Sequence, residues 1–246
     1  MKKPRIAFSP TDQANLKYFE MMKNSLRKFH SEEDLPLLLI GPEQIAKYND
    51  PEFFYRHKPI VMSELIQEYE TVIGIDADSI ITGNLSHIWE DDFDVAVVQN
   101  SNPREDKAYP IRFLSIHPLD YVNCGLVVVK SEKFMKHWHK LAFSPHFRNF
   151  QYREQDLLNI MVHYGDYNVK FLDKSNKWHG LISKGYWSQI ELRGDQLWLP
   201  KNEEWPQDED KQIVVLHYAG GNTEKWRDMN IKFKPEIVKR IEELIN

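Results

Sequence analysis

Two aspartates at the end of an apolar run constrain this chain more than any other feature. Val72 to Ile75 is apolar, Asp76 and Asp78 follow it, and Ile80-Ile81 resumes the apolar pattern. An ionised carboxylate among apolar side chains is costly unless it is paired or holds a cation. The neighbouring sequence supplies no partner for these two carboxylates. The pair therefore predicts a metal site at the end of a buried strand.

Strand and helix patterns alternate ahead of the aspartates. Arg5 to Ser9 is typical of a buried strand, and apolar residues between Leu16 and Phe29 recur at helical spacing. Leu35 to Ile40 predicts a second strand, Ser63 to Tyr69 a helix, and Thr71 to Ile75 the strand that ends at the aspartates. This order predicts an α/β fold with a doubly wound, mainly parallel sheet flanked by helices. In such sheets, ligands bind at the carboxyl ends of the strands.

The rest of the chain continues the α/β pattern. Strands are expected at Asp94 to Val98, Tyr121 to Val129 and Gln212 to Leu216, and helices at Glu132 to Leu141, Gln155 to Tyr164 and Lys234 to Ile245. Residues 43–60 are expected to form short helical pieces and loops, and residues 165–211 mostly loop. The 246 residues would suffice for one large α/β domain or two small ones, and we expect one. The sequence shows no internal repeat.

Composition excludes several classes of function. A formal net charge of -5 and a pI of about 6.1 provide no basic surface for nucleic acid. Cys124 is the one cysteine, so the chain forms no internal disulfide. No run approaches the ~20 apolar residues that span a bilayer, and the basic start at Lys2 and Lys3 lacks the apolar segment of a signal peptide. We therefore expect a soluble, cytoplasmic protein, with peripheral membrane attachment left open.

His217 is the third candidate metal ligand. It directly follows the predicted strand at Gln212 to Leu216, and Gly220-Gly221 lies just beyond it. Side chains two apart on a strand share a side, so Asp76 and Asp78 can face one ion, and such oxygen ligands suit Mn²⁺ or Mg²⁺. Each signal alone has a plain structural reading, because Asp-X-Asp often forms a turn and a lone histidine is often a hydrogen-bonded core residue. Their placement after two apolar strands favours the metal site.

Four motifs, in this order, resemble one family of proteins. They are Ile75-Asp76-Ala77-Asp78 with Gly83-Asn84-Leu85, Asn123-Cys124-Gly125, Glu154-Gln155-Asp156-Leu157-Leu158-Asn159, and His217-Tyr218-Ala219-Gly220 with Lys225-Trp226. The chain from about residue 5 to residue 226 resembles the retaining glycosyltransferases of GT-A fold to which glycogenin and the bacterial lipopolysaccharide galactosyltransferases belong. The resemblance implies a Rossmann-like GT-A sheet in one domain, 1–246, with a nucleotide-binding half at 1–100 and an acceptor half with the C-terminal helix at 101–246.

The resemblance also implies a hexosyltransferase that uses a UDP-sugar, Mn²⁺ or Mg²⁺, and a carbohydrate or other hydroxyl acceptor. It assigns the residues as follows: Asp76, Asp78 and His217 to the metal; Thr11, Asp12, Lys58, Ala77, Gly220 and Lys225 to the nucleotide-sugar donor; and Asn123, Glu154 and Gln155 to the reacting sugar. Two positions depart from the family pattern. Glu154 replaces an aspartate, and Lys225 lies eight rather than six residues after His217, with no proline before Trp226.

Some of these residues have simpler readings. Glu154 and Gln155 open a predicted helix, where polar side chains cap the backbone. Arg56, like Lys58, could add positive charge beside the donor. Six of the seven tryptophans lie in the second half and are expected in the core or its rim, with Trp178 and Trp187 as the best candidates for stacking on an acceptor sugar.

Two other classes of function fit part of the pattern. A magnesium-dependent phosphohydrolase of the haloacid dehalogenase kind also has an Asp-X-Asp after a strand, but there the motif closes the first strand, and His217 would have no role. A nucleotidyltransferase would need a glycine-rich loop after the first strand, which is missing. A non-catalytic nucleotide-sugar-binding protein would need only the metal and the donor site.

Overall fold

A six-stranded, mainly parallel sheet forms the centre of the molecule. The computed structural model describes residues 2–100, 109–111, 114–117, 120–182, 184–201, 209–217 and 233–246, with the backbone alone at 109–111, 114–115 and 184–186. The strand order is β2-β1-β3-β8-β5-β9, with only β8 antiparallel to its neighbours. These strands are β1 (Lys3–Pro10), β2 (Leu37–Ile40), β3 (Tyr69–Ile75), β5 (Val95–Gln99), β8 (Val122–Val129) and β9 (Val169–Phe171).

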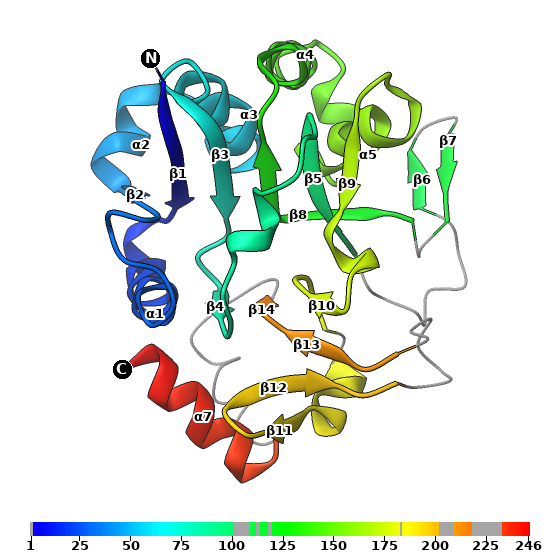
Figure 1. Ribbon diagram of the computed structural model, residues 1–246. Helices are drawn as coiled ribbons and strands as arrows, with labels where there is room; N and C mark the ends of the chain where they lie inside the picture. Colours follow the sequence, from blue (N-terminus) through cyan, green and yellow to red (C-terminus); the bar gives the residue numbers. More distant parts are fainter. Residues whose placement is uncertain are drawn as a thin grey trace.

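In Figure 1, two smaller sheets lie below the main one, and a third, two-stranded sheet lies to its right. A four-stranded sheet has the order β10-β13-β12-β11, from β10 (Lys177–Trp178), β11 (Glu191–Arg193), β12 (Gln196–Leu199) and β13 (Lys211–Ile213). A two-stranded antiparallel ladder pairs β4 (Ser79–Ile81) with β14 (Val215–His217). A hairpin joins β6 (Tyr109–Ile111) and β7 (Leu114–Ile116).

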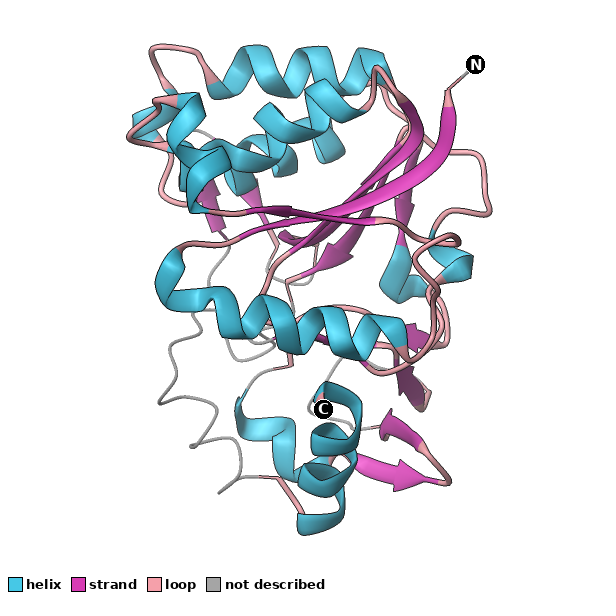
Figure 2. Ribbon diagram, turned by 90° about the vertical axis from the view of Figure 1, so that its left-hand side faces the viewer, coloured by secondary structure: helices cyan, strands magenta, loops and turns pink. Residues whose placement is uncertain are grey.

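Helices cover both faces of the main sheet (Figure 2). They are α1 (Leu16–Arg27), α2 (Pro42–Tyr48), α3 (Phe53–Leu65), α4 (Glu132–Ala142) and α5 (Glu154–Tyr164). A further helix, α7 (Pro235–Ile245), packs on the small sheet instead. Short 3-10 turns are η1 (Gln13–Asn15), η2 (Ser86–Ile88), η3 (Phe147–Asn149), η4 (Leu172–Lys174) and η5 (Lys184–Gln189). No helix among the described residues is long and apolar enough to cross a membrane.

Alternating side chains divide the interior into three apolar clusters. On β3, Val72 packs with the helices α3, α4 and α5, whereas Ile73 packs with α1 on the opposite face. On the ladder, Ile81 joins this α1 cluster, and Ile80 faces the third cluster, formed by the small sheet and α7. The β4-β14 ladder therefore separates two cores and holds the small sheet against the main one.

The structure corrects three expectations for secondary structure. The helix expected at Ser63 to Tyr69 is the end of α3, which begins at Phe53; a break at Arg56 (φ -146°) places Pro59 near the start of the regular part, where proline is tolerated. The strand expected at Gln212 to Leu216 is two strands in different sheets, with Val214 between them. The region after residue 165 contains β9 to β13 rather than mostly loop.

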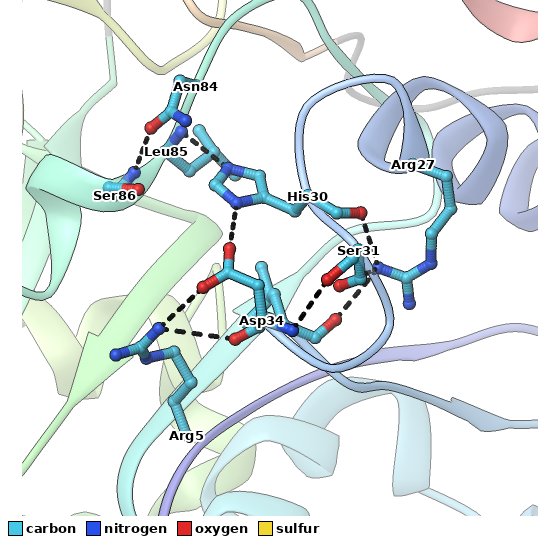
Figure 3. A network of polar contacts seen from close by, with 9 residues as sticks. Arg5, Arg27, His30, Ser31, Asp34, Asn84, Leu85 and Ser86 are labelled. Atoms are coloured by element: carbon cyan, nitrogen blue, oxygen red, sulfur yellow. Dashed lines mark hydrogen bonds and ion pairs between the residues drawn. The ribbon is translucent and has the colours of Figure 1, made fainter.

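A buried histidine fixes the loop that follows the β4 strand (Figure 3). His30 is 2% exposed, and its Nε2 accepts a hydrogen bond of 2.9 Å from the backbone N–H of Leu85. Its Nδ1 lies 2.6 Å from Oδ2 of Asp34, whose Oδ1 pairs with Arg5 at 3.0 Å. Since Nε2 is the acceptor, the ring is the neutral tautomer with its proton on Nδ1. The network joins β1 and the segment before β2 to the chain just beyond the paired aspartates.

Candidate active site

Asp76, Asp78 and His217 lie together at the carboxyl end of β3. Their ligating atoms are all within 4.8 Å of one another. The Nε2 atom of His217 is 3.2 Å from Oδ1 of Asp78 and 3.7 Å from Oδ2 of Asp76. The register of the ladder explains the meeting, because His217 pairs directly with Ser79, one residue after Asp78. Asp78 and His217, which are 139 positions apart in the sequence, thus belong to one cluster.

Gly125 makes room for the His217 ring. A Cβ atom at position 125 would lie 2.1 Å from Cε1 and 2.2 Å from Nδ1 of His217, and 2.7 Å from Oδ1 of Asn123. The carbonyl of Gly125 also accepts a hydrogen bond of 2.8 Å from the backbone N–H of Asp76. The backbone of β8 therefore supports the aspartate turn, and the absence of a side chain at Gly125 leaves space for the His217 imidazole. This gives the Asn-Cys-Gly motif a physical reason.

The three side chains fit a divalent cation. Two carboxylates and one imidazole nitrogen are a donor set suited to Mn²⁺ or Mg²⁺ that leaves positions for substrate oxygens. Burial works to lower the pKa of His217, but the carboxylates of Asp78 and Asp76 outweigh it and raise that pKa. A bound cation would take the place of the proton that these carboxylates favour on His217. Of the three residues, His217 is the buried one, at 4% exposed.

A chain of buried polar groups lies behind Asp76. The Lys58 ammonium, 1% exposed, donates to Oδ1 of Asp76 at 2.5 Å and to Nε2 of His57 at 3.0 Å. On the other side of the imidazole, Nδ1 of His57 lies 3.6 Å from Oε1 of Glu154. Lys58 therefore reaches the site through Asp76, the carboxylate that it holds in place. The sequence reasoning did not identify His57 as part of the site, although this residue directly precedes Lys58 in the sequence.

Burial sets the charge states along this chain. It lowers the pKa of His57 to about 3, aided by Lys58, so the ring is neutral at pH 7. Burial also raises the pKa of Glu154 to about 8, against the opposing effect of Lys58, so this carboxyl group is mainly protonated at pH 7. Burial would lower the pKa of Lys58, but Asp76 and Glu154 reverse that and raise it. One ammonium thus remains charged beside the candidate cation site.

A pocket of about 440 Å³ opens in front of the aspartates. Its lining comes from the end of β1, the following turn, α1, α3 and the aspartate turn. It consists of Pro10, Thr11, Asp12, Asn15, Tyr18, Phe54, His57, Asp76, Ala77 and Asp78. The carboxylate of Asp12 caps the first turn, because its Oδ1 accepts from the backbone N–H of Asn15 at 3.0 Å and from the Asn15 side chain at 2.7 Å. Thr11, Asp12 and Ala77, which the sequence assigned to the donor, thus line the same pocket as the aspartates.

Asn123 and Gln155 form a second polar cluster, which meets the first at Gly125. The Oε1 atom of Gln155 accepts from Nδ2 of Asn123 at 3.1 Å and from the backbone N–H of Cys124 at 3.0 Å. Oδ1 of Asn123 accepts from the N–H of Gly125 at 2.6 Å. These bonds fix the orientation of both amides, and Oδ1 of Asn123 lies next to Gly125 on the same side as the His217 ring.

Glu154 lies beside Gln155 in sequence but has different surroundings. It is 6% exposed, and its Oε2 has no hydrogen-bond partner among the described residues. Glu154 stands in the first turn of α5, as expected, and its carboxyl group lies in the buried chain with His57 and Lys58. The preceding residue, Arg153, has φ 50° and ψ -118°, a conformation that non-glycine residues rarely adopt and that collects at functional sites.

The sequence reasoning did not assign three further residues that support the Asn123-Gln155 cluster. The Tyr121 hydroxyl donates to Oδ1 of the buried Asp156 at 2.6 Å, and Nε2 of Gln155 lies 3.3 Å from the same hydroxyl. Asn100, at the end of β5, contacts Asn123 at 3.4 Å through its Oδ1. Asp156 could have been found, because it belongs to the same helix-opening motif as Gln155. Tyr121 and Asn100 carry no such signal.

Three sequence expectations fail or lie outside the described residues. Arg56 does not approach the site: its guanidinium pairs with Asp50 at 2.6 Å and with Glu52 at 3.0 Å, at the start of α3. Trp178 and Trp187 are 3% and 2% exposed, so they belong to the core and not to an acceptor surface. The donor residues predicted at Gly220 and Lys225, in the segment 218–232, lie outside the described residues.

Solved structures share this fold over almost the whole chain. The galactosyltransferase LgtC, solved with donor and acceptor sugar analogues, matches 98% of this chain and 95% of its own, with 15% identity and a TM-score of 0.59. A glycosyltransferase involved in glycosylation of the PBCV-1 major capsid covers 93% and 99%, with 14% identity and a TM-score of 0.56. GlyE of Streptococcus pneumoniae covers 98% and 63%, with 16% identity and a TM-score of 0.54. A comparison with curated protein sequences gives no significant match.

The fold is therefore the GT-A fold of glycosyltransferases, a single domain built on a mixed, mainly parallel sheet. The sequence profile named Glycosyl transferase family 8 matches residues 8–230. This chain belongs to that family and is a glycosyltransferase. The match gives no support to the phosphohydrolase alternative.

Proposed function

We propose that the protein transfers a hexose from a UDP-sugar to an acceptor hydroxyl, with Mn²⁺ or Mg²⁺ bound by Asp76, Asp78 and His217, and with retention of configuration. The observation that carries the proposal is that ligating atoms of these three side chains lie within 4.8 Å of one another, and that two of the three, Asp76 and Asp78, line the 440 Å³ pocket. Family membership supports a nucleotide-sugar donor and a divalent ion. The acceptor is a carbohydrate or another molecule with a hydroxyl group.

We assign the lining residues of the pocket to different parts of a nucleotide sugar. Thr11 and Asp12, at the end of β1, would contact the nucleoside, and Ala77 would lie beside the diphosphate between the aspartates. In this proposal residues 1–100 bind the nucleotide, and residues 101–246 provide the acceptor side. Gly220 and Lys225 are proposed to complete the diphosphate site. A bound divalent ion would act as a Lewis acid toward the departing diphosphate.

Lys58 contributes to the proposed reaction through Asp76. Its ammonium is buried against Oδ1 of Asp76, so it orients this carboxylate and adds a fixed positive charge behind the diphosphate. Because the Lys58 pKa is raised, the charge persists across the neutral range. The neutral His57 ring accepts from the same ammonium and restricts its position.

Asn123 and Gln155 are proposed to position the sugar. Their amides are held by the backbone of Cys124 and Gly125 and by the Tyr121 hydroxyl, so little reorganisation is needed when a sugar hydroxyl binds. The bond between the anomeric carbon and the diphosphate oxygen breaks, and the acceptor oxygen bonds to that carbon on the same face. The acceptor proton passes to the departing diphosphate. Glu154, being mainly protonated at pH 7, is a poor nucleophile, and we propose that it helps to hold the polar chain behind the site.

A panel of nucleotide sugars, incubated with the enzyme and Mn²⁺, Mg²⁺ or EDTA, tests this function. The proposal expects release of a nucleoside diphosphate from a UDP-hexose, and loss of this activity in EDTA. Asp78→Asn should lower the rate by on the order of 100-fold, whereas the exposed control Asp166→Asn should leave it unchanged. Equal turnover in EDTA, or release of phosphate from simple phosphomonoesters without donor turnover, would contradict the proposal.

A further inference from the structure

A second pocket lies at the opposite end of the β4-β14 ladder from the cation site. It has a volume of about 290 Å³ and shares no lining residue with the larger pocket. His217 and Ser79 pair at one end of the ladder, whereas Thr82, at the other end, donates from its backbone N–H to the carbonyl of Val214. At the rise of a β-strand, these ends are roughly 10 Å apart. The lining consists of Phe29, Thr82, Gly83, Asn84, Lys177, Asp195, Gln196, Gln212, Val214 and Arg240.

Lys177 brings an unneutralised charge to this pocket. Its ammonium lies 3.1 Å from Nδ1 of His87 and forms no ion pair with the described residues. The His87 ring does not neutralise this charge, because it acts as a neutral hydrogen-bond acceptor toward Lys177. Its role follows from a series of hydrogen bonds that begins at Asp173. Nδ1 of His179 faces the carboxylate of Asp173 at 3.2 Å and so carries a proton. Nε2 of His179 then accepts from Nε2 of His87, 2.6 Å away, which leaves Nδ1 of His87 as the acceptor for Lys177.

The charge state of His87 agrees with this geometry. Burial, followed by the neighbouring His179, Lys177 and Lys170, lowers the pKa of His87 to about 3. At pH 7 the His87 ring is neutral, so it contributes no charge beside Lys177. The positive charge of Lys177 therefore remains uncompensated by the groups around it.

Arg240 brings a second, incompletely paired cation. Its side chain is 19% exposed, and its Nε is buried with no hydrogen-bond partner. Nη1 lies 3.4 Å from Glu243, and Nη2 lies 3.8 Å from Asp195, both longer than a charge-assisted hydrogen bond of about 2.8 Å. Asp195 is the acidic residue of the lining, but its side chain is 80% exposed, so solvent screens its charge.

The remaining lining suits a polar molecule of sugar size. Asn84, Gln196 and Gln212 offer amide donors and acceptors, and Phe29 contributes an apolar face. Gly83 keeps the space open, since a Cβ atom there would lie 2.8 Å from Cγ1 of Val214 and 3.5 Å from Nε2 of Gln212. The volume is close to the lower bound of about 300 Å³ for small-molecule pockets.

We propose that this pocket binds a second small ligand, a sugar-sized molecule with a phosphate or carboxylate group that Lys177 and Arg240 hold. The oxyanion would accept from the Lys177 ammonium and the Arg240 guanidinium, and the amides of Gln196, Gln212 and Asn84 would contact its hydroxyl groups. The site is separate from the proposed donor site, so its occupancy requires neither UDP nor a divalent cation.

Calorimetry in EDTA tests this inference, with a hexose phosphate, a hexuronate, inorganic phosphate and glucose as probes. We expect saturable binding of a hexose phosphate or a hexuronate at concentrations up to roughly 10 mM, and no binding of glucose. Lys177→Gln and Arg240→Gln should each weaken binding by about tenfold or more. The matched controls Lys174→Gln and Lys239→Gln change exposed lysines nearby and should bind as the wild type does.

Amide resonances locate the ligand and guard against variants that misfold. In ¹⁵N-labelled wild-type protein, the signals of Gly83 and of the Gln196 and Gln212 side chains should shift, and that of Asn15 in the larger pocket should not. Inorganic phosphate that binds as tightly as the hexose phosphate would identify a free ion as the ligand and support the oxyanion chemistry. The proposal is overturned if none of the anionic probes binds, if glucose binds equally, or if the two variants retain full affinity with native circular dichroism.

Discussion

Gly125 determines whether His217 can reach the paired aspartates. The His217 ring packs directly on the α-carbon of this residue, and the Asn123 amide approaches the same point. The candidate cation site and the Asn123-Gln155 cluster are therefore joined at a position where only a hydrogen atom fits. This close approach is a property of one residue, and a substitution there tests the link between the two clusters.

Gly125→Ala should displace the His217 ring and weaken divalent-cation binding by on the order of 100-fold. The physical reason is that the new Cβ would lie 2.1 Å from the ring, with β8 backbone on one side and β14 on the other. We also expect overpacking to lower the free energy of unfolding by about 1–3 kcal/mol. Mn²⁺ titration and urea unfolding measure the two effects. Gly194→Asn, at an open position with φ 65°, is the control and should change neither; unchanged Mn²⁺ affinity in Gly125→Ala would contradict the packing argument.

Glu154→Gln should stabilise the protein at high pH and have little effect at low pH. Burial raises the pKa of Glu154 from 4.5 to about 8, so its contribution to stability is fully present below pH 4.5 and is lost as pH rises through about 8. The variant should therefore gain on the order of a few kcal/mol over the wild type at about pH 9, and almost nothing at about pH 4.

Urea unfolding of both proteins at the two pH values checks this difference. His57 has the opposite dependence, since its lowered pKa gives stability that is present above pH 6.5 and lost as pH falls through about 3. The contribution of His57 is present in both the wild type and Glu154→Gln, so it largely cancels when their stabilities are compared. A Glu154→Gln variant that is less stable than the wild type at high pH would show that Glu154 is held as a carboxylate.

The β4-β14 ladder is the element on which both pockets depend. It places His217 beside Asp78 at one end and Thr82 in the second pocket at the other. The loop that leaves β4 is tied to the main sheet by His30, which accepts from the N–H of Leu85 (Figure 3). The ladder is therefore held from both sides, by the small-sheet core and by this buried histidine.

His30→Ala should destabilise the protein by about 2–4 kcal/mol, because it leaves the Leu85 N–H unpaired and opens a cavity beside Trp89. The affinity for a divalent cation should fall less than in Gly125→Ala, since His30 acts on the ladder and not on the ligands. Thermal unfolding and Mn²⁺ titration measure these effects. The exposed His146→Ala is the control. If His30→Ala unfolds with wild-type stability, the network does not hold the ladder.

Over the whole molecule, local patterns predicted most elements, and long-range pairing explains the errors. The runs at Val72 to Ile75 and Tyr121 to Val129 became β3 and β8, because continuous apolar segments read clearly as buried strands. The run at Gln212 to Leu216 looks equally continuous, yet it changes sheets at Val214 because its two halves pair with different partners. Such a change depends on residues far away in sequence and has no local signal.

The candidate site divides in the same way. Asp76, Asp78, His217, Asn123 and Gln155 could be named because each lies in a motif at a strand or helix end. The residues that support them could not be named from the sequence, because these contacts form only in the folded chain. Examples are the contact of Gly125 with His217 and the link from Lys58 through His57 toward Glu154. Arg56 was misread because its charge suits a donor, while its acidic partners Asp50 and Glu52 are nearby in sequence.

Calorimetry with UDP and Mn²⁺ tests the central claim, that Asp76, Asp78 and His217 bind a cation which in turn binds a nucleotide diphosphate. The wild type should bind UDP in a Mn²⁺-dependent manner, and Asp78→Ala should lose this dependence while it keeps the fold. The exposed control Asp166→Ala should bind as the wild type does. Equal Mn²⁺-dependent binding of UDP by the wild type and by Asp78→Ala would contradict the account.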